Sequence, residues 1–152
     1  MLYLCVKWLH ILSSTVLFGT GAGTAFFMLM ANRTRDLKAI RFATRTVVIA
    51  DWLFTTPAVI IQPVTGFILA KIAGYPLSTP WLVMAILLYL FAGACWLPVV
   101  WIQLKLRTLA AAAETELPAQ YWALNRGWLI LGSLAFPAVM VIFWLMVFTP
   151  SF

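Results

Sequence analysis

Residues 81–104 read WLVMAILLYLFAGACWLPVVWIQL, and this stretch decides the fold class. It contains no Asp, Glu, Lys or Arg. A helix that rises 1.5 Å per residue needs ~20 apolar residues to cross ~30 Å of hydrocarbon, and this stretch meets that length. Backbone polar groups in lipid must be satisfied within the segment, so the stretch predicts a membrane-spanning helix rather than a strand.

Three further stretches of the chain have the same character. Formal charge is absent from 8–32 and 127–152, and 47–70 contains only Asp51. The whole chain is 64% apolar and 9% charged, whereas a soluble domain carries roughly 25% charged residues. We therefore predict an all-α fold, a four-transmembrane-helix bundle that forms one polytopic domain over residues 1–152. The expected helices cover about 3–30, 45–72, 80–106 and 122–148.

The basic residues predict how the chain crosses the membrane. Most of the ten lie in or beside the first and third connections: Arg33, Arg35, Lys38, Arg41, Arg45, Lys105, Arg107 and Arg126. Because basic residues stay on the cytoplasmic side, these connections are expected inside and both termini outside, N-out and C-out. The chain then forms two parallel helical hairpins. The net charge of +6 is explained by this orientation, and no soluble basic face for nucleic acid is visible.

The polar residues of the first two helices form the main candidate site. Lys7, His10 and Ser14 are spaced to share one helical face, and His10 is the single histidine of the chain. Gln62 and Thr65 of the second helix are expected at about the depth of His10. A neutral imidazole is a common metal and haem-iron ligand. The alternative is a histidine that bonds to Gln62 or Thr65 and holds the two helices together.

Two more features of the spans leave alternatives open. Asp51 is the only acidic residue within a predicted span, and it serves either in an ion pair with Arg45 or Arg126 or in a proton relay. Gly19, Gly21 and Gly23 give the first helix a small-residue face. Such a face lets a neighbouring helix, or the flat face of a macrocycle, come close to the backbone, and helix packing is the interpretation we favour.

Several short motifs resemble a bacterial integral-membrane family of unknown function. They are KWLHIL (7–12), FGTG (18–21), DWLFTTPA (51–58) and GACWLP (93–98), and the resemblance covers nearly the whole chain. It implies a multi-pass protein of the bacterial inner (plasma) membrane.

The Lys-x-x-His of the first helix and the Thr-Pro-Ala at 56–58 are also distantly similar to the J-type, oxygen-independent protoporphyrinogen oxidases. Those are small helical membrane proteins associated with b-type haem. The resemblance maps their haem-linked histidine onto His10 and the neighbouring lysine onto Lys7. That family carries a lysine, and usually a histidine, in its third helix, where this chain has neither at 81–84. The resemblance therefore implies haem binding through His10 rather than the oxidase activity.

Together these observations give one leading functional hypothesis and two others. In the leading one, a b-type haem with His10 as its axial metal ligand serves electron transfer or tetrapyrrole-linked redox chemistry. Lys7 would pair with a propionate, and Gln62 and Thr65 would orient the imidazole. The second hypothesis is a small-ligand or copper-binding or transport protein that uses His10 and the methionines Met84, Met140 and Met146. The third is a structural homo-oligomer or accessory subunit of a larger membrane complex, in contact with the lipid bilayer.

Overall fold

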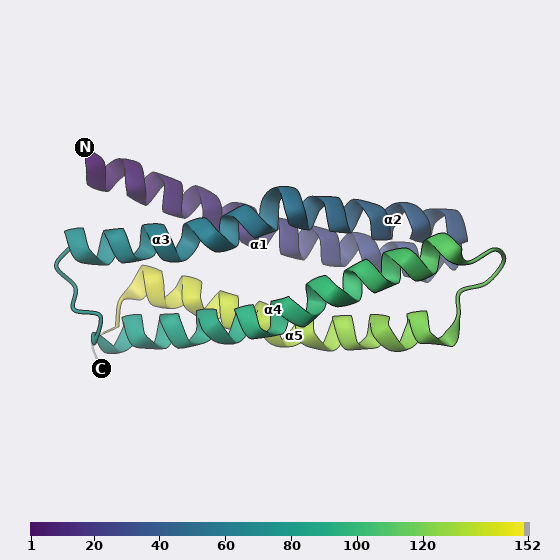
Figure 1. Ribbon diagram of the computed structural model, residues 1–152. Coiled ribbons are helices and arrows are strands. Elements are labelled where there is room, and N and C mark those ends of the chain that lie inside the picture. The colour runs from purple at the N-terminus through teal and green to yellow at the C-terminus, as the bar shows by residue number, and fades with distance from the viewer. Residues whose placement is uncertain (151–152) are drawn as a thin grey trace.

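The computed structural model describes residues 1–150, and every regular element in that range is helical (Figure 1). The elements are α1 (Leu2–Thr34), α2 (Leu37–Ala50), the π-helical turn η1 (Asp51–Thr55), α3 (Thr56–Ile72), α4 (Pro80–Ala112) and α5 (Ala119–Phe148). The turn η1 joins α2 and α3 into one continuous segment, so that four segments are long and apolar enough to cross a membrane. The predicted all-α, four-span fold is confirmed. Residues 151–152 of the predicted domain lie outside the described residues.

The helices extend beyond the predicted bounds at one end. The first and third predictions end at 30 and 106, whereas α1 continues to Thr34 and α4 to Ala112. Each of these helices has 33 residues and is therefore about 50 Å long, compared with ~30 Å of hydrocarbon. The extra turns carry charged side chains and project beyond the apolar layer, a region that hydropathy alone does not mark as helical.

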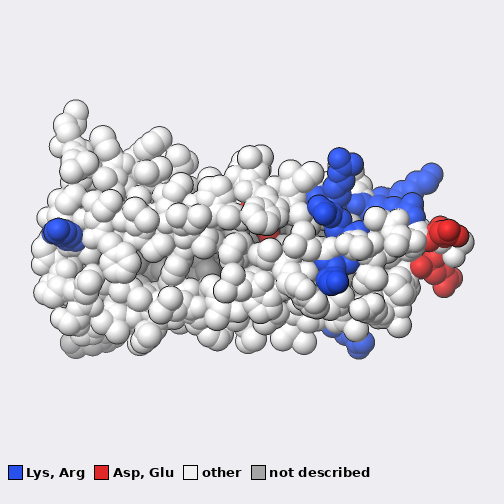
Figure 2. Space-filling model, in the orientation of Figure 1, with Lys and Arg blue, Asp and Glu red and all other residues white. Residues whose placement is uncertain are grey.

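The two ends of the bundle differ in charge (Figures 1 and 2). Both ends of the described chain and the 73–79 connection lie at one end, which we call the terminal end. The other end, which we call the basic end, holds the connections at 35–36 and 113–118. Figure 2 shows Lys and Arg gathered near the basic end, with Asp and Glu at its tip. This segregation along the bundle axis is the pattern from which we predict that the basic end is cytoplasmic.

A two-residue corner joins α1 to α2. Arg35 adopts a left-handed conformation with φ 57°, which ends α1. The Asp36 carboxylate then accepts a hydrogen bond from the Lys38 backbone N–H at 3.0 Å and caps α2. After this cap, Ile40 and Val47 are fully buried and pack α2 against the core. The short corner holds α1 and α2 in antiparallel contact.

The π-helical turn in the second span has a local cause in the sequence. The Thr56 backbone N–H bonds to the Asp51 carbonyl, five residues back instead of the usual four. Pro57 follows immediately, and because it has no N–H, it cannot form the ordinary bond to the carbonyl of Leu53. The backbone therefore bulges just before the proline. Asp51 and Thr55, one turn apart, are both buried by this geometry.

The four spans pack tightly together only toward the basic end. There α1, α2, α4 and α5 share a core of Met28, Ala31, Ile40, Ala43, Val47, Ile102, Leu106, Ala110, Tyr121 and Trp128. A smaller cluster from α3, α4 and α5 lies toward the terminal end and contains Ala70, Trp81, Leu82, Ala85 and Leu145. The larger core therefore fixes the relative positions of the spans from the basic end.

Toward the terminal end the bundle separates into two helix pairs, α1 with α3 and α4 with α5. Large side chains bridge the pairs in place of close backbone contact. Phe18 of α1 stacks on Phe136 of α5, with ring centroids 4.9 Å apart, and meets Phe143 edge-on at 5.5 Å. The Tyr89 hydroxyl of α4 donates to the Val59 carbonyl of α3 at 2.5 Å. The usual donor to that carbonyl would be Pro63, which has no N–H, so Tyr89 satisfies a carbonyl that the proline leaves free.

The expected packing of a neighbouring helix against the small-residue face of α1 does not occur within the described chain. A Cβ placed on Gly19, Gly21 or Gly23 would meet no other atom within 4 Å. The helix contacts its neighbours instead through a different face, which includes Ser13, Met28 and Ala31, all buried. Within residues 1–150 the glycine face is therefore directed outward.

Candidate functional site

The imidazole of His10 is held against α3 near the terminal end. Its Nδ1 lies 2.7 Å from the Thr65 hydroxyl oxygen in a hydrogen bond between the two helices. Thr65 is buried, whereas His10 is partly exposed. Gly66, the next residue of α3, lies beside the ring, and a Cβ there would be 3.4 Å from His10 Cε1. A glycine at this position lets α3 come close to the imidazole.

The Thr65 hydroxyl determines which imidazole nitrogen carries the proton. Its single hydrogen is donated to the Ile61 carbonyl, at 2.7 Å, within α3. With the hydrogen placed there, the oxygen accepts from His10 and Nδ1 carries the ring proton. We assign the neutral ring as this tautomer, in which Nε2 carries a free lone pair. No hydrogen bond engages Nε2 within residues 1–150, and this is the nitrogen that a metal ion would take.

Gln62 lies in the same cluster but contacts α1 differently from the prediction. Its amide nitrogen donates to the His10 backbone carbonyl at 2.7 Å and to the Ser13 hydroxyl at 2.5 Å. It therefore ties α3 to the backbone of α1 and positions the turn that carries the imidazole, whereas the Thr65 side chain bonds to the ring itself. Gln62 therefore lies at the depth of His10, as the sequence analysis predicted.

The remaining residues of the predicted site are not part of this cluster. Lys7 is exposed, and its Nζ lies 5.8 Å from the centre of the Tyr3 ring. Met84, Met140 and Met146 are between 38% and 50% exposed on α4 and α5, so they present their thioethers outward. No group of three or more His, Cys, Asp or Glu residues able to hold a metal ion occurs among the described residues. The structure therefore offers one imidazole rather than a multi-ligand cage.

Asp51 forms a second polar site, and its surroundings correct one of our expectations. The Thr55 hydroxyl donates to its carboxylate at 2.9 Å, and the amide of Gln103 from α4 faces the same group. Neither Arg45 nor Arg126 forms an ion pair with Asp51 within the part of the chain described, because both side chains point outward and are exposed. Of the two roles considered for Asp51, the ion pair is wrong.

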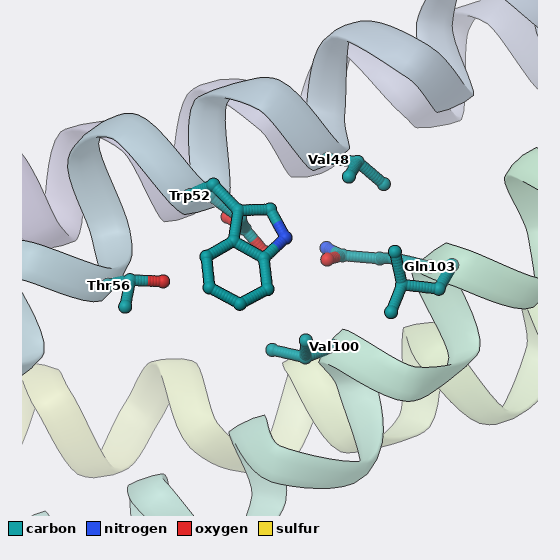
Figure 3. Close-up of a pocket in the computed structure, with 7 residues that line it drawn as sticks. Val48, Trp52, Thr56, Val100 and Gln103 are labelled. Atoms are coloured by element: carbon teal, nitrogen blue, oxygen red, sulfur yellow. The ribbon is translucent and has the colours of Figure 1, made fainter.

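Gln103 is the polar residue of this second site that sequence reasoning missed. It is 5% exposed, and Figure 3 shows its amide directed from α4 across the interface toward the Trp52 ring of η1. The signal was present in the sequence, because Gln103 is the one amide side chain in the stretch 81–104. A polar side chain within an apolar run predicts a partner on another helix.

A third polar cluster, near the basic end, was also not predicted from the sequence. The Tyr121 hydroxyl donates to Asn32 Oδ1 at 2.7 Å, and Asn32 Nδ2 donates to Asn125 Oδ1 at 2.9 Å. All three side chains are buried between α1 and α5. Asn32 lies at the boundary between the apolar run and the basic residues, where an asparagine is expected to be solvent-exposed. The two hydrogen bonds link all three side chains across the α1–α5 interface, which indicates a structural role.

The four apolar spans and the few, mutually bonded polar side chains define an integral membrane protein that crosses the bilayer four times. More particularly, the chain belongs to a family of predicted integral membrane proteins of unknown function, DUF2269, whose model matches residues 4–150. Comparison with curated proteins and with solved structures found no match.

Proposed function

We propose that the protein holds a b-type haem near the terminal end, with His10 as axial ligand, and that it serves electron transfer or tetrapyrrole-linked redox chemistry. The observation that carries the proposal is the bond between His10 Nδ1 and Thr65, which leaves Nε2 as a free lone pair on a fixed ring. A histidine that ligates a metal characteristically donates its other ring N–H to an acceptor in this way.

The residues around His10 fit the group. The requirement for protein ligands is small, because a haem brings four equatorial nitrogens of its own and takes only axial ligands from the protein. A single imidazole without further clustered metal-binding side chains suits such a group better than it suits a copper site, which usually uses several soft or imidazole ligands. When bound, the haem would supply one-electron chemistry to the membrane protein.

The chain's own residues have distinct tasks under this proposal. Thr65 fixes the tautomer and the ring direction, and Gln62 holds the α1 turn at the residue that carries the ring. Lys7 lies one helical turn farther toward the terminal end, is exposed and is free of any carboxylate partner among the described residues, so its ammonium is available to pair with a propionate.

The test is the visible absorption spectrum of the protein purified in mild detergent from haem-replete cells, recorded oxidised and dithionite-reduced. We expect a Soret band and a reduced α-band in the wild type, and loss of both in His10→Ala. Thr65→Val should retain some haem with altered bands, because the ring is kept but its orienting acceptor is removed. Lys7→Ala tests the pairing with a propionate. Lys71→Ala is its matched control, since both lysines are exposed near the terminal end.

A colourless wild type would refute the haem proposal. The His10–Thr65 bond would then have only the role of joining α1 to α3. Retention of the full spectrum in His10→Ala, with the helical content unchanged by circular dichroism, would show that haem is bound elsewhere and would refute the assigned ligand.

A further inference from the structure

The carboxyl group of Asp51 is buried within a membrane span and has no cationic partner among residues 1–150. It is 6% exposed and lies in η1, in the interior of the Leu37–Ile72 segment. Moving an ionised carboxylate into an apolar environment without a counter-charge is costly, and such a group typically takes up a proton instead. No part of the proposed haem site uses this residue, so its presence in the span requires a separate explanation.

No charged group from any element packed against η1 offsets a negative charge at this position. The helix α1 has no titratable side chain between His10 and Arg33, and α3 has none before Lys71. On α2 the nearest is Arg45, which is exposed, and on α4 Lys105 lies over the Trp101 ring, 5.9 Å from its centre. Arg126 of α5 is exposed as well. Cys95 and Tyr89 of α4 are titratable but form no bond to the carboxylate in the part of the chain described, and Tyr89 is bonded to Val59.

The immediate neighbours of the carboxyl group are neutral hydrogen-bonding groups. Thr55 donates to it at 2.9 Å, and the Gln103 amide faces it from α4. An amide can donate to a carboxylate through its NH₂ and accept from a protonated carboxyl through its oxygen, so Gln103 can satisfy either form by rotating. This pairing suits a group that changes its protonation state.

A small cavity beside Asp51 provides a place for the exchanging proton. It has a volume of about 10 Å³ and is lined by Val48, Asp51, Trp52, Thr56, Val100, Gln103 and Leu104 (Figure 3). That volume is close to the room one water molecule needs, and the polar partners of such a water would be Asp51, Thr56 and Gln103. A hard metal cation typically wants six or more oxygen ligands, whereas most of this lining is apolar.

We propose that Asp51 is a proton-binding site within the membrane, at the interface between η1 and α4. The carboxylic acid releases its proton to a water molecule in the adjacent cavity, and the resulting carboxylate takes it back from the same position. Thr55 and Gln103 hold both forms of the group by hydrogen bonds. The proposal rests on the Asp51 site alone and does not depend on His10 or on haem.

The experiment is labelling with dicyclohexylcarbodiimide, a hydrophobic reagent that enters the membrane and reacts with protonated carboxyl groups. The full-length protein in phospholipid vesicles is treated in buffers between about pH 5 and pH 9, a range that covers the pKa values found for buried carboxyl groups in proteins. The modified residue is located by mass spectrometry of peptides. We expect the label on Asp51 at the acid end, and at least about a tenfold loss across the range, since the protonated fraction falls tenfold per pH unit above its midpoint. Asp51→Asn should lose the label, and Glu114→Gln, which removes an exposed carboxyl at the basic end, should keep it.

Three outcomes would overturn the proposal. Absence of label on Asp51 at every pH would indicate a permanently ionised group, and pH-independent labelling would indicate a permanently protonated one. Protection by Na⁺, but not by an equal concentration of choline, would identify a metal-cation site instead. Because the wild-type protein is mapped residue by residue, the result stands even if Asp51→Asn fails to fold. Failure of the haem experiment would leave this result unchanged.

Discussion

Replacing Asn32 by Ala is expected to destabilise the protein more than removing either of the two polar groups to which Asn32 bonds. The Asn32 amide accepts from the Tyr121 hydroxyl and donates to Asn125, and all three side chains are at most 8% exposed. Asn32→Ala breaks both hydrogen bonds and leaves a buried hydroxyl and a buried amide oxygen without partners. Tyr121→Phe and Asn125→Ala each break only one bond.

The magnitudes follow from the number of groups left unpaired. A buried donor or acceptor that loses its partner costs about 1–3 kcal/mol, and hydrogen bonds between membrane helices contribute about 0.6 kcal/mol on average and up to about 1.7. We therefore expect Tyr121→Phe to lower the free energy of unfolding by about 1 kcal/mol. Asn32→Ala should lower it by about 2–4 kcal/mol, because two partners are orphaned and side-chain volume is lost.

The assay is reversible unfolding in mixed detergent micelles, followed by circular dichroism, with the four members of a double-mutant cycle. In the Asn32→Ala background, Tyr121→Phe should cost nothing or restore some stability, since the hydroxyl it removes no longer has a partner. An equal cost of Tyr121→Phe in both backgrounds would refute the reasoning, because it would show that the hydroxyl contributes through something other than Asn32.

Two other predictions follow from single features of the fold. Tyr89→Phe should lower the free energy of unfolding by about 1 kcal/mol, because it leaves the Val59 carbonyl without a donor. The control Tyr3→Phe, which removes an exposed phenolic hydroxyl, should change the free energy of unfolding by less than about 0.5 kcal/mol. Equal effects of the two substitutions would contradict the role given to Tyr89. For orientation, alkaline phosphatase fused to the carboxyl terminus should be active, and the same enzyme inserted in the 113–118 connection should be inactive, since phosphatase matures only outside the cytoplasm; the reverse pattern would overturn the predicted N-out, C-out topology.

Parts of the candidate site could be predicted because they depend on spacing along single helices. His10, Gln62 and Thr65 are polar positions in apolar runs, and polar groups in lipid are expected to find partners on other helices. Matching their depths predicted Gln62 or Thr65 as the partner of the imidazole, and the structure shows the bond to Thr65. The partner of the Gln62 amide was not predictable in the same way, because choosing between the ring and the backbone carbonyl requires the rotation of both helices.

The Asp51 site shows where this reasoning fails. Arg45 and Arg126 are close to Asp51 in sequence or predicted depth, so opposite charge favoured an ion pair, yet the carboxylate faces Gln103 across the interface. The π-helical turn contributes to the difference, because one extra residue in the turn rotates every following side chain relative to those before it. Pro57 marks the position of that irregularity, but a proline by itself does not specify whether a helix kinks or bulges.

The sequence by itself determined that this protein is a four-span membrane bundle with most of its charges at one end, because membrane crossing depends on the length and hydropathy of each segment separately. Only the tertiary structure decided which face of each helix meets its neighbours. It turned the Gly19–Gly23 face outward and brought Asp51 to Gln103 and His10 to Thr65. The physical reason is that lipid and bundle interior are about equally apolar, so the pattern of apolar residues that marks the buried face of a soluble helix is absent from α1, α3, α4 and α5.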